Sequence, residues 1–238
     1  MIENGWTESA SAWIDVQGED GDFGRRFVLD APMMSRIRGR GFASALDVGC
    51  GEGRFCRMLA AEGIRTIGVD PTERLLCRAR EKDPAGDYRD GRAERLEFAD
   101  ESFDLVVSYL TLVDIPDIHN ALAEMVRVLK PGGTLLIANL NSFNTAGPPR
   151  GWMKDADGNP RFYIDNYLEE RPEWYEWLGI RVRNWHRPLS LYMRILLGHG
   201  LQLRYFDEPA PYGGDPLKIE RHRRVPHFLV MDWQKPAL

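Results

Sequence analysis

The sequence predicts an α/β protein: a Rossmann-like, doubly wound seven-stranded sheet, mostly parallel with an antiparallel terminal strand, plus a cap inserted after strand five. Apolar strand-like runs alternate with helical patterns over residues 42–140, an alternation typical of parallel βαβ units. A glycine turn at 49–53 follows the first of these strands, and Asp70 ends the second. Both features belong at the carboxyl edge of a nucleotide-binding sheet.

The expected elements divide the chain into three parts. Residues 1–40 carry N-terminal helices, because apolar residues recur there at helical spacing. Residues 41–140 and 188–238 form the sheet with its covering helices. Residues 141–187 interrupt this core between the fifth strand and the next helix.

Each core element is bounded by recognisable stop signals. Pro131-Gly132-Gly133 ends the helix before the fifth strand, and His199-Gly200 ends a later helix. The two N-terminal helices are expected at 6–17 and 24–39. The predicted core elements are strand 43–48, helix 53–62, strand 65–69, helix 72–82, strand 86–89, strand 103–109, helix 117–129, strand 133–140, helix 189–197 and strands 201–206 and 225–231.

The segment 141–187 breaks the alternation of strands and helices. It opens on a stretch rich in Asn, Gly and Pro that continues neither a helix nor a strand. A loop this long is usually functional or disordered, and its aromatic content argues against disorder. Because it emerges where ligands of open α/β sheets bind, we interpret it as an aromatic-rich substrate cap. A structural subdomain or a dimer contact is the alternative. Its tryptophans are Trp152, Trp174, Trp177 and Trp185.

The glycine turn and the acid after it indicate which ligand the sheet holds. Glycine lets the backbone turn and approach a ligand where a Cβ would clash, and Asp70 can accept hydrogen bonds from both hydroxyls of a ribose. A dinucleotide fingerprint needs a third glycine where this chain has Arg54, and no Lys-Ser or Lys-Thr follows the turn as a phosphate loop requires. The pattern favours an adenosine-containing cofactor without a pyrophosphate.

Four motifs in the expected order resemble the class I S-adenosylmethionine-dependent methyltransferases. The first is Asp47-Val-Gly-Cys-Gly-Glu-Gly53, and Asp70-Pro71 matches the family's ribose-binding strand end. The stretch 91–98 resembles its adenine loop, and 128–137 resembles its helix end, turn and fifth strand. Trp185-His-Arg-Pro-Leu-Ser190 looks like the ubiquinone-biosynthesis-like branch, methyltransferase type 11.

The resemblance implies S-adenosyl-L-methionine as the cofactor and places the N-terminal helices over its pocket, with Trp13 as a lid residue or a core residue. The family's adenine loop usually carries an acid directly before the alanine, where this chain has Arg92. Either Asp90 takes that role, or the Ala93 backbone N–H and apolar packing hold the adenine, with Arg92 stacking on the base. Asp47 is expected to orient the turn or to meet the cofactor's amine. The implied cofactor-binding residues are Asp47, Gly49, Cys50, Gly51, Asp70, Pro71, Arg92, Ala93 and Ser108.

The acceptor side is predicted from residue chemistry and position. A hydroxyl or protonated amine acceptor must lose a proton, which a neutral histidine can take near pH 7. His186 lies where the cap meets the core, so it is the candidate general base or substrate contact, and holding the cap in place is the alternative. Tyr109 is expected beside the transferring methyl or in the core. Trp152 and Tyr163 are candidate cap residues facing the substrate.

Composition disfavours several other classes of function. The net charge of −5 argues against nucleic acid as the principal substrate, because neutralising phosphates needs a basic face. The locally basic stretch 218–224 is expected to be a solvated loop. No apolar run approaches the ~20 residues that span a bilayer, and no signal peptide is recognisable, so a cytoplasmic protein without a membrane partner is expected. The three cysteines lack metal-ligand spacing and fit reduced, packed thiols in a protein without a metal.

We therefore predict methyl transfer from S-adenosylmethionine to a small-molecule acceptor by in-line displacement. The cap holds seven basic and seven acidic residues, so its charge favours neither an anionic nor a cationic acceptor. Its aromatic side chains suggest a flat or apolar molecule. A non-catalytic cofactor-binding protein and a methyltransferase acting on a macromolecule are the alternatives. The methylated atom, the acceptor and the oligomeric state are not readable from the sequence.

Overall fold

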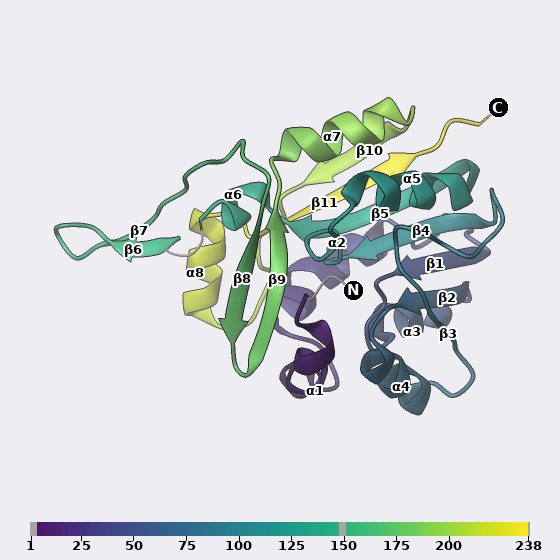
Figure 1. The fold of residues 1–238 in the computed structure, drawn as a ribbon, viewed down its shortest axis with the longest axis horizontal. Coiled ribbons are helices and arrows are strands. Elements are labelled where there is room, and N and C mark those ends of the chain that lie inside the picture. Colours follow the sequence, from purple (N-terminus) through teal and green to yellow (C-terminus); the bar gives the residue numbers. More distant parts are fainter. Residues whose placement is uncertain (1–3, 148–150, 238) are drawn as a thin grey trace.

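The chain folds around one central sheet. The computed structural model describes residues 4–147 and 151–237; residues 1–3, 148–150 and 238, which belong to the expected N-terminal region, cap and core, lie outside the described residues. Within the described residues the sheet has seven strands in the order β10-β11-β5-β4-β1-β2-β3 (Figure 1). The strands are β1 Ser44–Val48, β2 Arg65–Asp70, β3 Asp87–Asp90, β4 Phe103–Tyr109, β5 Leu129–Leu140, β10 Gln202–Asp207 and β11 Phe228–Gln234.

Strands β1 to β5 are parallel, and β11 runs antiparallel to both β5 and β10. The predicted fold class is therefore confirmed. The strand order reverses at β1, which has β2 on one side and β4 on the other. Ligands of such sheets bind beyond the carboxyl ends of the strands at this switch point. The glycine turn follows β1 and Asp70 ends β2, so both lie at this edge.

Neighbouring residues of the central strands pack on opposite faces of the sheet. On β4, Val106 belongs to a buried cluster with α5 and α7, whereas Leu105 and Val107 belong to one with η1, α2 and α3. This period of two is that of a parallel strand buried on both faces, which makes the sheet doubly wound. The helices of the core are α3 Arg54–Ala61, α4 Glu73–Lys82, α5 Ile118–Val128 and α7 Leu189–Gly198.

The N-terminal region contains the expected first helix and an altered second one. Helix α1 (Trp6–Gln17) coincides with the range expected from the sequence. The second expected helix, at 24–39, is a π-helical turn, η1 (Arg25–Leu29), continued by the short helix α2 (Asp30–Ser35). A π-turn often accompanies a functional site, and η1 faces the pocket described below.

The basic stretch 218–224 is helical, so its prediction as a loop was wrong. It lies in α8 (Pro216–Arg224). Asp215 caps this helix by accepting a hydrogen bond from the Leu217 N–H at 2.9 Å. Pro216 occupies the first turn, where a missing N–H leaves no helical bond unmade. These start signals were present in the sequence, and the density of charge obscured them.

The segment 141–187 is built around two antiparallel hairpins, which the sequence analysis did not predict. The β6–β7 hairpin stands away from the central sheet, and the β8–β9 hairpin runs past α1 (Figure 1). The β8–β9 turn places Leu178 and Gly179 at φ of 46° and 80°, as a two-residue hairpin turn requires. The elements are α6 Ser142–Thr145, β6 Trp152–Lys154, β7 Pro160–Phe162, β8 Arg171–Trp177 and β9 Ile180–His186.

Strand β9 is attached directly to the N-terminal helix. The Arg181 N–H donates to Ser9 Oγ at 2.9 Å, and Ser9 Oγ in turn lies 2.9 Å from the Arg181 carbonyl oxygen. The Arg183 N–H donates to the Asn4 carbonyl oxygen at 2.9 Å. Two segments that are far apart in the sequence therefore form one wall beside the carboxyl edge of the sheet.

Candidate functional site

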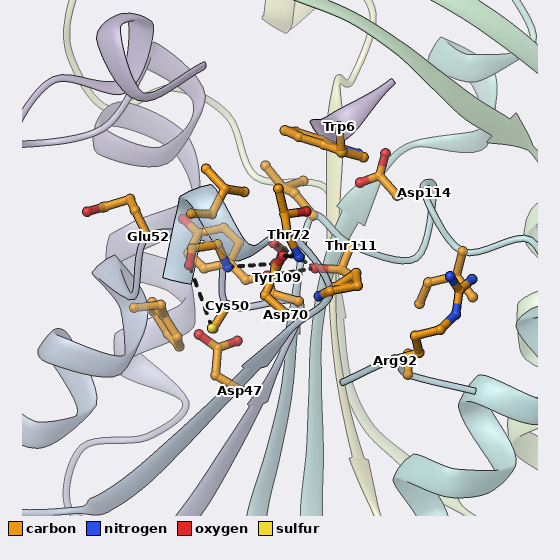
Figure 2. Close-up of a pocket in the computed structure, with 18 of the residues that line it drawn as sticks. Trp6, Asp47, Cys50, Glu52, Asp70, Thr72, Arg92, Tyr109, Thr111 and Asp114 are labelled. Carbon is orange, nitrogen blue, oxygen red and sulfur yellow. Dashed lines mark hydrogen bonds between the residues drawn. The ribbon is translucent and has the colours of Figure 1, made fainter. Parts of the chain in front are cut away.

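A cavity that is open to solvent lies at the carboxyl edge of the sheet (Figure 2). Its inner wall comes from the glycine turn and the loops that follow β2 and β3. Its outer wall comes from α1 and η1, and its remaining side comes from the turn after β4. This is the place that the strand order predicts for a ligand.

The glycines of the turn are required by its geometry. Gly49 and Gly53 adopt φ of +78° and +74°, a region that side chains rarely tolerate. A Cβ on Gly49 would lie 2.2 Å from Thr111 Cγ2, and one on Gly53 would lie 2.5 Å from Tyr88 Cε1. Thr111 and Tyr88 therefore pack closely against the turn and leave no room for a side chain at either position.

Asp70 ends β2 at the cavity and is buried. Its Oδ2 accepts from the Gly51 N–H at 2.9 Å, and its Oδ1 accepts from the Thr72 N–H at 2.8 Å. Burial raises the pKa of Asp70, and the hydrogen bonds from Thr72 and Gly51 oppose that shift. The carboxyl group thus fixes the glycine turn. Because a carboxylate oxygen has a second lone pair, Asp70 can still accept from the hydroxyls of a ligand.

Asp47, near the end of β1, is a second buried acid at the cavity. Its Oδ2 accepts from the Cys56 thiol at 3.4 Å, and its Oδ1 has no hydrogen-bond partner among the described residues. Burial raises the pKa of Asp47 to about 7; the Cys56 hydrogen bond opposes this shift and the charge of Asp70 adds to it. A ligand ammonium group would satisfy Oδ1 and stabilise the ionised form.

The loop after β3 forms the end of the cavity that lies farthest from Glu52. Arg92 projects into this end (Figure 2). Ala93 is buried at this end, and Arg92 lies 3.3 Å from the carboxylate of Glu94. Asp90 does not line the cavity. Of the two arrangements considered for an adenine, the geometry therefore favours the one that uses the Ala93 backbone and the Arg92 side chain.

Aromatic side chains and one arginine form the outer wall. Trp6 and Trp13 are seven residues apart on one face of α1, and their rings pack edge to face with centroids 5.9 Å apart. A Cβ on Gly51 would lie 3.5 Å from the Trp13 ring, so Trp13 covers the glycine turn. The Arg25 guanidinium lies 5.4 Å from the Trp13 centroid and 5.8 Å from the Tyr109 centroid. The sequence analysis missed Trp6 and Arg25, although Trp6 shares its helical face with Trp13.

The turn after β4 supplies the side of the cavity opposite the loop after β3. Tyr109, the last residue of β4, lines the cavity, and its hydroxyl donates to Asp30 Oδ1 at 2.8 Å. Leu110 then adopts φ of +60°, which is strained for a residue other than glycine. This abrupt change of direction brings Thr111 and Asp114 to the cavity wall.

Asp114 faces the cavity below Trp6 (Figure 2). Its Oδ1 accepts from Asn184 Nδ2 of β9 at 2.6 Å, and the Trp6 indole is within hydrogen-bonding reach. Burial raises the pKa of Asp114 to about 7. The charge of Asp70 adds to this shift, whereas the two hydrogen-bond donors and the charge of Arg25 oppose it.

Arg187, directly after β9, holds the turn that carries Asp114. Its fully buried guanidinium donates to the carbonyl oxygens of Leu112 at 3.1 Å, Ile115 at 2.8 Å and Pro116 at 3.0 Å. Its Nε also pairs with Glu170 at 2.6 Å. The planar guanidinium suits this task, because its five donors can reach several acceptors at once. The sequence analysis missed Arg187, since nothing in the sequence places its partners nearby.

His186, the predicted general base, does not line the cavity. Its Nε2 lies 2.9 Å from the Tyr167 carbonyl oxygen and its Nδ1 lies 2.8 Å from Thr145 Oγ1. A carbonyl can only accept, so Nε2 carries the proton and Nδ1 accepts from the Thr145 hydroxyl. Burial lowers the pKa of His186. Both ring nitrogens are occupied by the segment 141–187, which is the alternative role considered for this residue.

Three further predicted residues also lie outside the cavity lining. Ser108 is fully buried in β4, because residues of this strand face the two helical layers. Trp152 packs on Phe162 within the β6–β7 hairpin, and Tyr163 follows that hairpin and is half-exposed. The hairpin stands away from the sheet (Figure 1), so neither side chain faces the cavity. The predicted residues that do line it are Asp47, Gly49, Cys50, Gly51, Asp70, Pro71, Arg92, Ala93 and Tyr109.

Known proteins with similar sequences and folds identify the class. Residues 46–137 match a methyltransferase domain family. A Mycolicibacterium smegmatis protein named as an S-adenosylmethionine-dependent methyltransferase is 30% identical over 203 residues, covering 85% of this chain and 72% of that protein. A demethylmenaquinone methyltransferase of Renibacterium salmoninarum is 33% identical over 161 residues, covering 68% of this chain and 65% of that enzyme. The crystal structure of an S-adenosylmethionine-dependent methyltransferase from Mesorhizobium loti has a TM-score of 0.78 at 26% identity, covering 91% of this chain and 100% of that chain.

The sheet order, the glycine turn and the acid that ends β2 define a class I S-adenosylmethionine-dependent methyltransferase. The chain belongs to this family, and S-adenosylmethionine is its cofactor. The unsatisfied Asp47 Oδ1 fits the amine of that cofactor, and Gly49 and Gly51, which line the cavity without side chains, leave room for its body. In the part of the chain that the structure describes, no helix is long and apolar enough to cross a membrane.

Proposed function

We propose that the enzyme transfers the methyl group of S-adenosylmethionine to a small molecule bound between the cofactor and the wall formed by α1 and β9. The observation that carries this proposal is the covered end of the cavity. Trp6 and Trp13 lie over it, and β9 is hydrogen-bonded to α1 beside it. A site covered in this way accommodates a small molecule or a slender extended group.

The residues that line the cavity can be assigned to successive parts of the cofactor. Asp70 would accept from the ribose hydroxyls, and Ala93 with Arg92 would hold the adenine. Asp47 would accept from the methionine ammonium group. Arg25 is the arginine nearest to the glycine turn on the outer wall, between Trp13 and Tyr109, and would pair with the methionine carboxylate. These assignments place Asp47 and Arg25 opposite cofactor groups of the opposite charge.

Aromatic surroundings favour a flat acceptor. Trp6, Trp13 and Tyr109 line the cavity near Asp114, and such pockets combine apolar rings with a few polar groups that orient the ligand. The sequence relative that is named a demethylmenaquinone methyltransferase supports the same class of acceptor. Other sequence relatives are named malonyl-[acyl-carrier protein] O-methyltransferases, for which an extended acyl group would enter the same space. We propose an aromatic hydroxyl compound as the first class to test.

A macromolecular acceptor is the alternative, and a partner protein is known for one structural relative. A methyltransferase from Haloferax volcanii in complex with a Trm112 activator has a TM-score of 0.71 at 19% identity, a likeness of fold. The net charge of −5 and the covered cavity favour a small molecule over RNA.

The test is formation of S-adenosylhomocysteine by the purified chain with separate acceptor pools. The pools are substituted phenols and hydroquinones, aliphatic carboxylic acids, and bulk tRNA. The proposal predicts turnover with the phenol and hydroquinone pool. Turnover with tRNA alone, or with the aliphatic acids alone, would contradict it.

A further inference from the structure

Asp114 lines the cavity and is assigned to no cofactor contact. The other unassigned charged groups of the lining, Glu52, Arg54 and Glu94, are ion-paired with Arg57, Asp30 and Arg92. It lies on the turn after β4, whereas the cofactor contacts come from the glycine turn, from the loops after β2 and β3, and from η1. Figure 2 places it beside Trp6, across the cavity from Asp47. A carboxyl group at this position meets the acceptor end of the cavity.

Hydrogen bonds from neighbouring elements hold the carboxyl group of Asp114 and the turn that carries it. Asn184 donates to its Oδ1 at 2.6 Å, and Arg187 binds three carbonyl oxygens of the turn on either side of it. Both partners come from β9 and the residue after it, and the Trp185 N–H donates to the Val113 carbonyl oxygen at 2.6 Å as well. Such a supporting shell holds a side chain at one position, as a catalytic group requires.

We propose that Asp114 is a catalytic residue that takes the proton from a hydroxyl acceptor during methyl transfer. This inference rests on the proposed function and specifies its substrate class: a neutral O–H compound that cannot ionise unaided at neutral pH. The acceptor oxygen forms a bond to the methyl carbon while the carbon–sulfur bond breaks and its electron pair stays on sulfur. The acceptor proton moves to a carboxylate oxygen of Asp114 and is later released to water.

The charges around Asp114 suit this role. The facing groups are Asp70 from β2, Arg25 from η1, Asn184 from β9 and the Trp6 indole from α1. Burial raises its pKa to about 7, so the group exchanges a proton near neutral pH. Asn184 and Arg187 are positioning residues, because they act through Asp114 and its turn.

The test compares acceptors that need a base with one that does not. The probes are phenol, hydroquinone and thiophenol, whose thiol is already largely ionised at neutral pH. The variants are Asp114→Asn, which keeps shape but removes the base, and Asp114→Glu, which keeps a carboxylate. Asp117→Asn is the matched control, because Asp117 is an exposed acid three residues away that caps α5, a role that Asn also fills.

Asp114→Asn is expected to lower kcat with phenol and hydroquinone by about 100-fold or more and to leave transfer to thiophenol close to the wild-type rate. The fall of activity at low pH should disappear in Asp114→Asn and return in Asp114→Glu. Affinity for S-adenosylhomocysteine, measured by calorimetry, should be unchanged and shows that the variants are folded.

Two results would overturn the inference. Equal losses of kcat with phenol and thiophenol in Asp114→Asn would show that Asp114 is a structural residue. Wild-type rates with all probes would show that it takes no part in the reaction. In both cases the proposal of methyl transfer to a small molecule stands. If the wild-type enzyme binds S-adenosylhomocysteine and transfers to none of the probes, the proposed function fails and the inference falls with it.

Discussion

The two ends of the cavity are built in different ways. The cofactor end comes mainly from one continuous stretch, 47–94, in which strands, turns and acids follow each other in order. The acceptor end is assembled from three distant segments, 4–17, 109–116 and 184–187. The difference explains how a common cofactor site can be combined with a variable acceptor site, because the second can change without altering the first.

The largest expected effect comes from the residue that joins the segments of the acceptor end. Arg187→Met leaves the carbonyl oxygens of Leu112, Ile115 and Pro116 without their buried donor. It also leaves Glu170 without its ion-pair partner. Each buried acceptor that is left without its donor typically costs ~1–3 kcal/mol, and three carbonyl oxygens lose their donor together. We expect a loss of that size in the free energy of unfolding, measured by urea denaturation.

Arg171→Met is the control for this prediction. Arg171 also donates to carbonyl oxygens of its neighbours, but those partners are exposed to solvent. Its removal should cost less than about 1 kcal/mol, as surface pairs do. Equal losses in the two variants would mean that Arg187 has no special part in assembling the acceptor end.

The next effect concerns the cofactor end alone. Asp70→Ala removes the proposed acceptor for the ribose and the hydrogen bonds that hold Gly51 and Thr72. Charge-assisted hydrogen bonds contribute ~1.5–3 kcal/mol each, so affinity for S-adenosylhomocysteine should fall by about 100-fold or more. Asp90→Ala is the control, since Asp90 pairs in register with Asp70 on β3 but does not line the cavity. A similar loss in Asp90→Ala would restore the alternative in which Asp90 binds the adenine.

Asp47→Asn should change the pH dependence of stability. Burial raises the pKa of Asp47 to about 7 in the folded chain, against about 3.9 in an unfolded one. The stabilising contribution of the protonated group is complete below about pH 4 and is lost as the pH rises to about 7. Between about pH 5 and pH 8 the apo variant should gain roughly 3 kcal/mol relative to wild type, measured by denaturation at each pH. Its affinity for the cofactor should fall, because the ammonium group loses a charged partner. A constant stability difference across this range would contradict the assignment.

The smallest effect is expected at His186. His186→Asn breaks the contacts to Thr145 and the Tyr167 carbonyl oxygen, which lie within the segment 141–187. A typical hydrogen bond contributes ~1 kcal/mol, so stability should fall modestly. The pH profile of methyl transfer should keep its shape in this variant. If the pH-dependent change in activity near neutral pH disappears in this variant, His186 takes part in the reaction after all.

The same contrast explains what the sequence could predict. The cofactor end is local: Gly49, Gly51 and Asp70 are identified by spacing along the chain, and each lies at the cavity. The acceptor end depends on β9, whose buried residues Ile180, Val182 and Asn184 alternate as in a strand. The alternation after Leu178-Gly179 is typical of a strand. The aromatic content of the segment was instead interpreted as a sign of a substrate cap. The chemistry of histidine and its position predict His186 as the base, whereas hydrogen-bond partners, which the sequence does not give, show that Arg187 supports the cavity.

The most direct test of the two-part cavity is the affinity for S-adenosylhomocysteine of Asp70→Ala and Asn184→Ala, measured by calorimetry beside turnover with hydroquinone. The account predicts that Asp70→Ala loses the affinity, whereas Asn184→Ala binds as the wild type does and loses turnover, because Asp114 is no longer held. Loss of affinity in Asn184→Ala equal to that in Asp70→Ala would contradict the separation of the two ends.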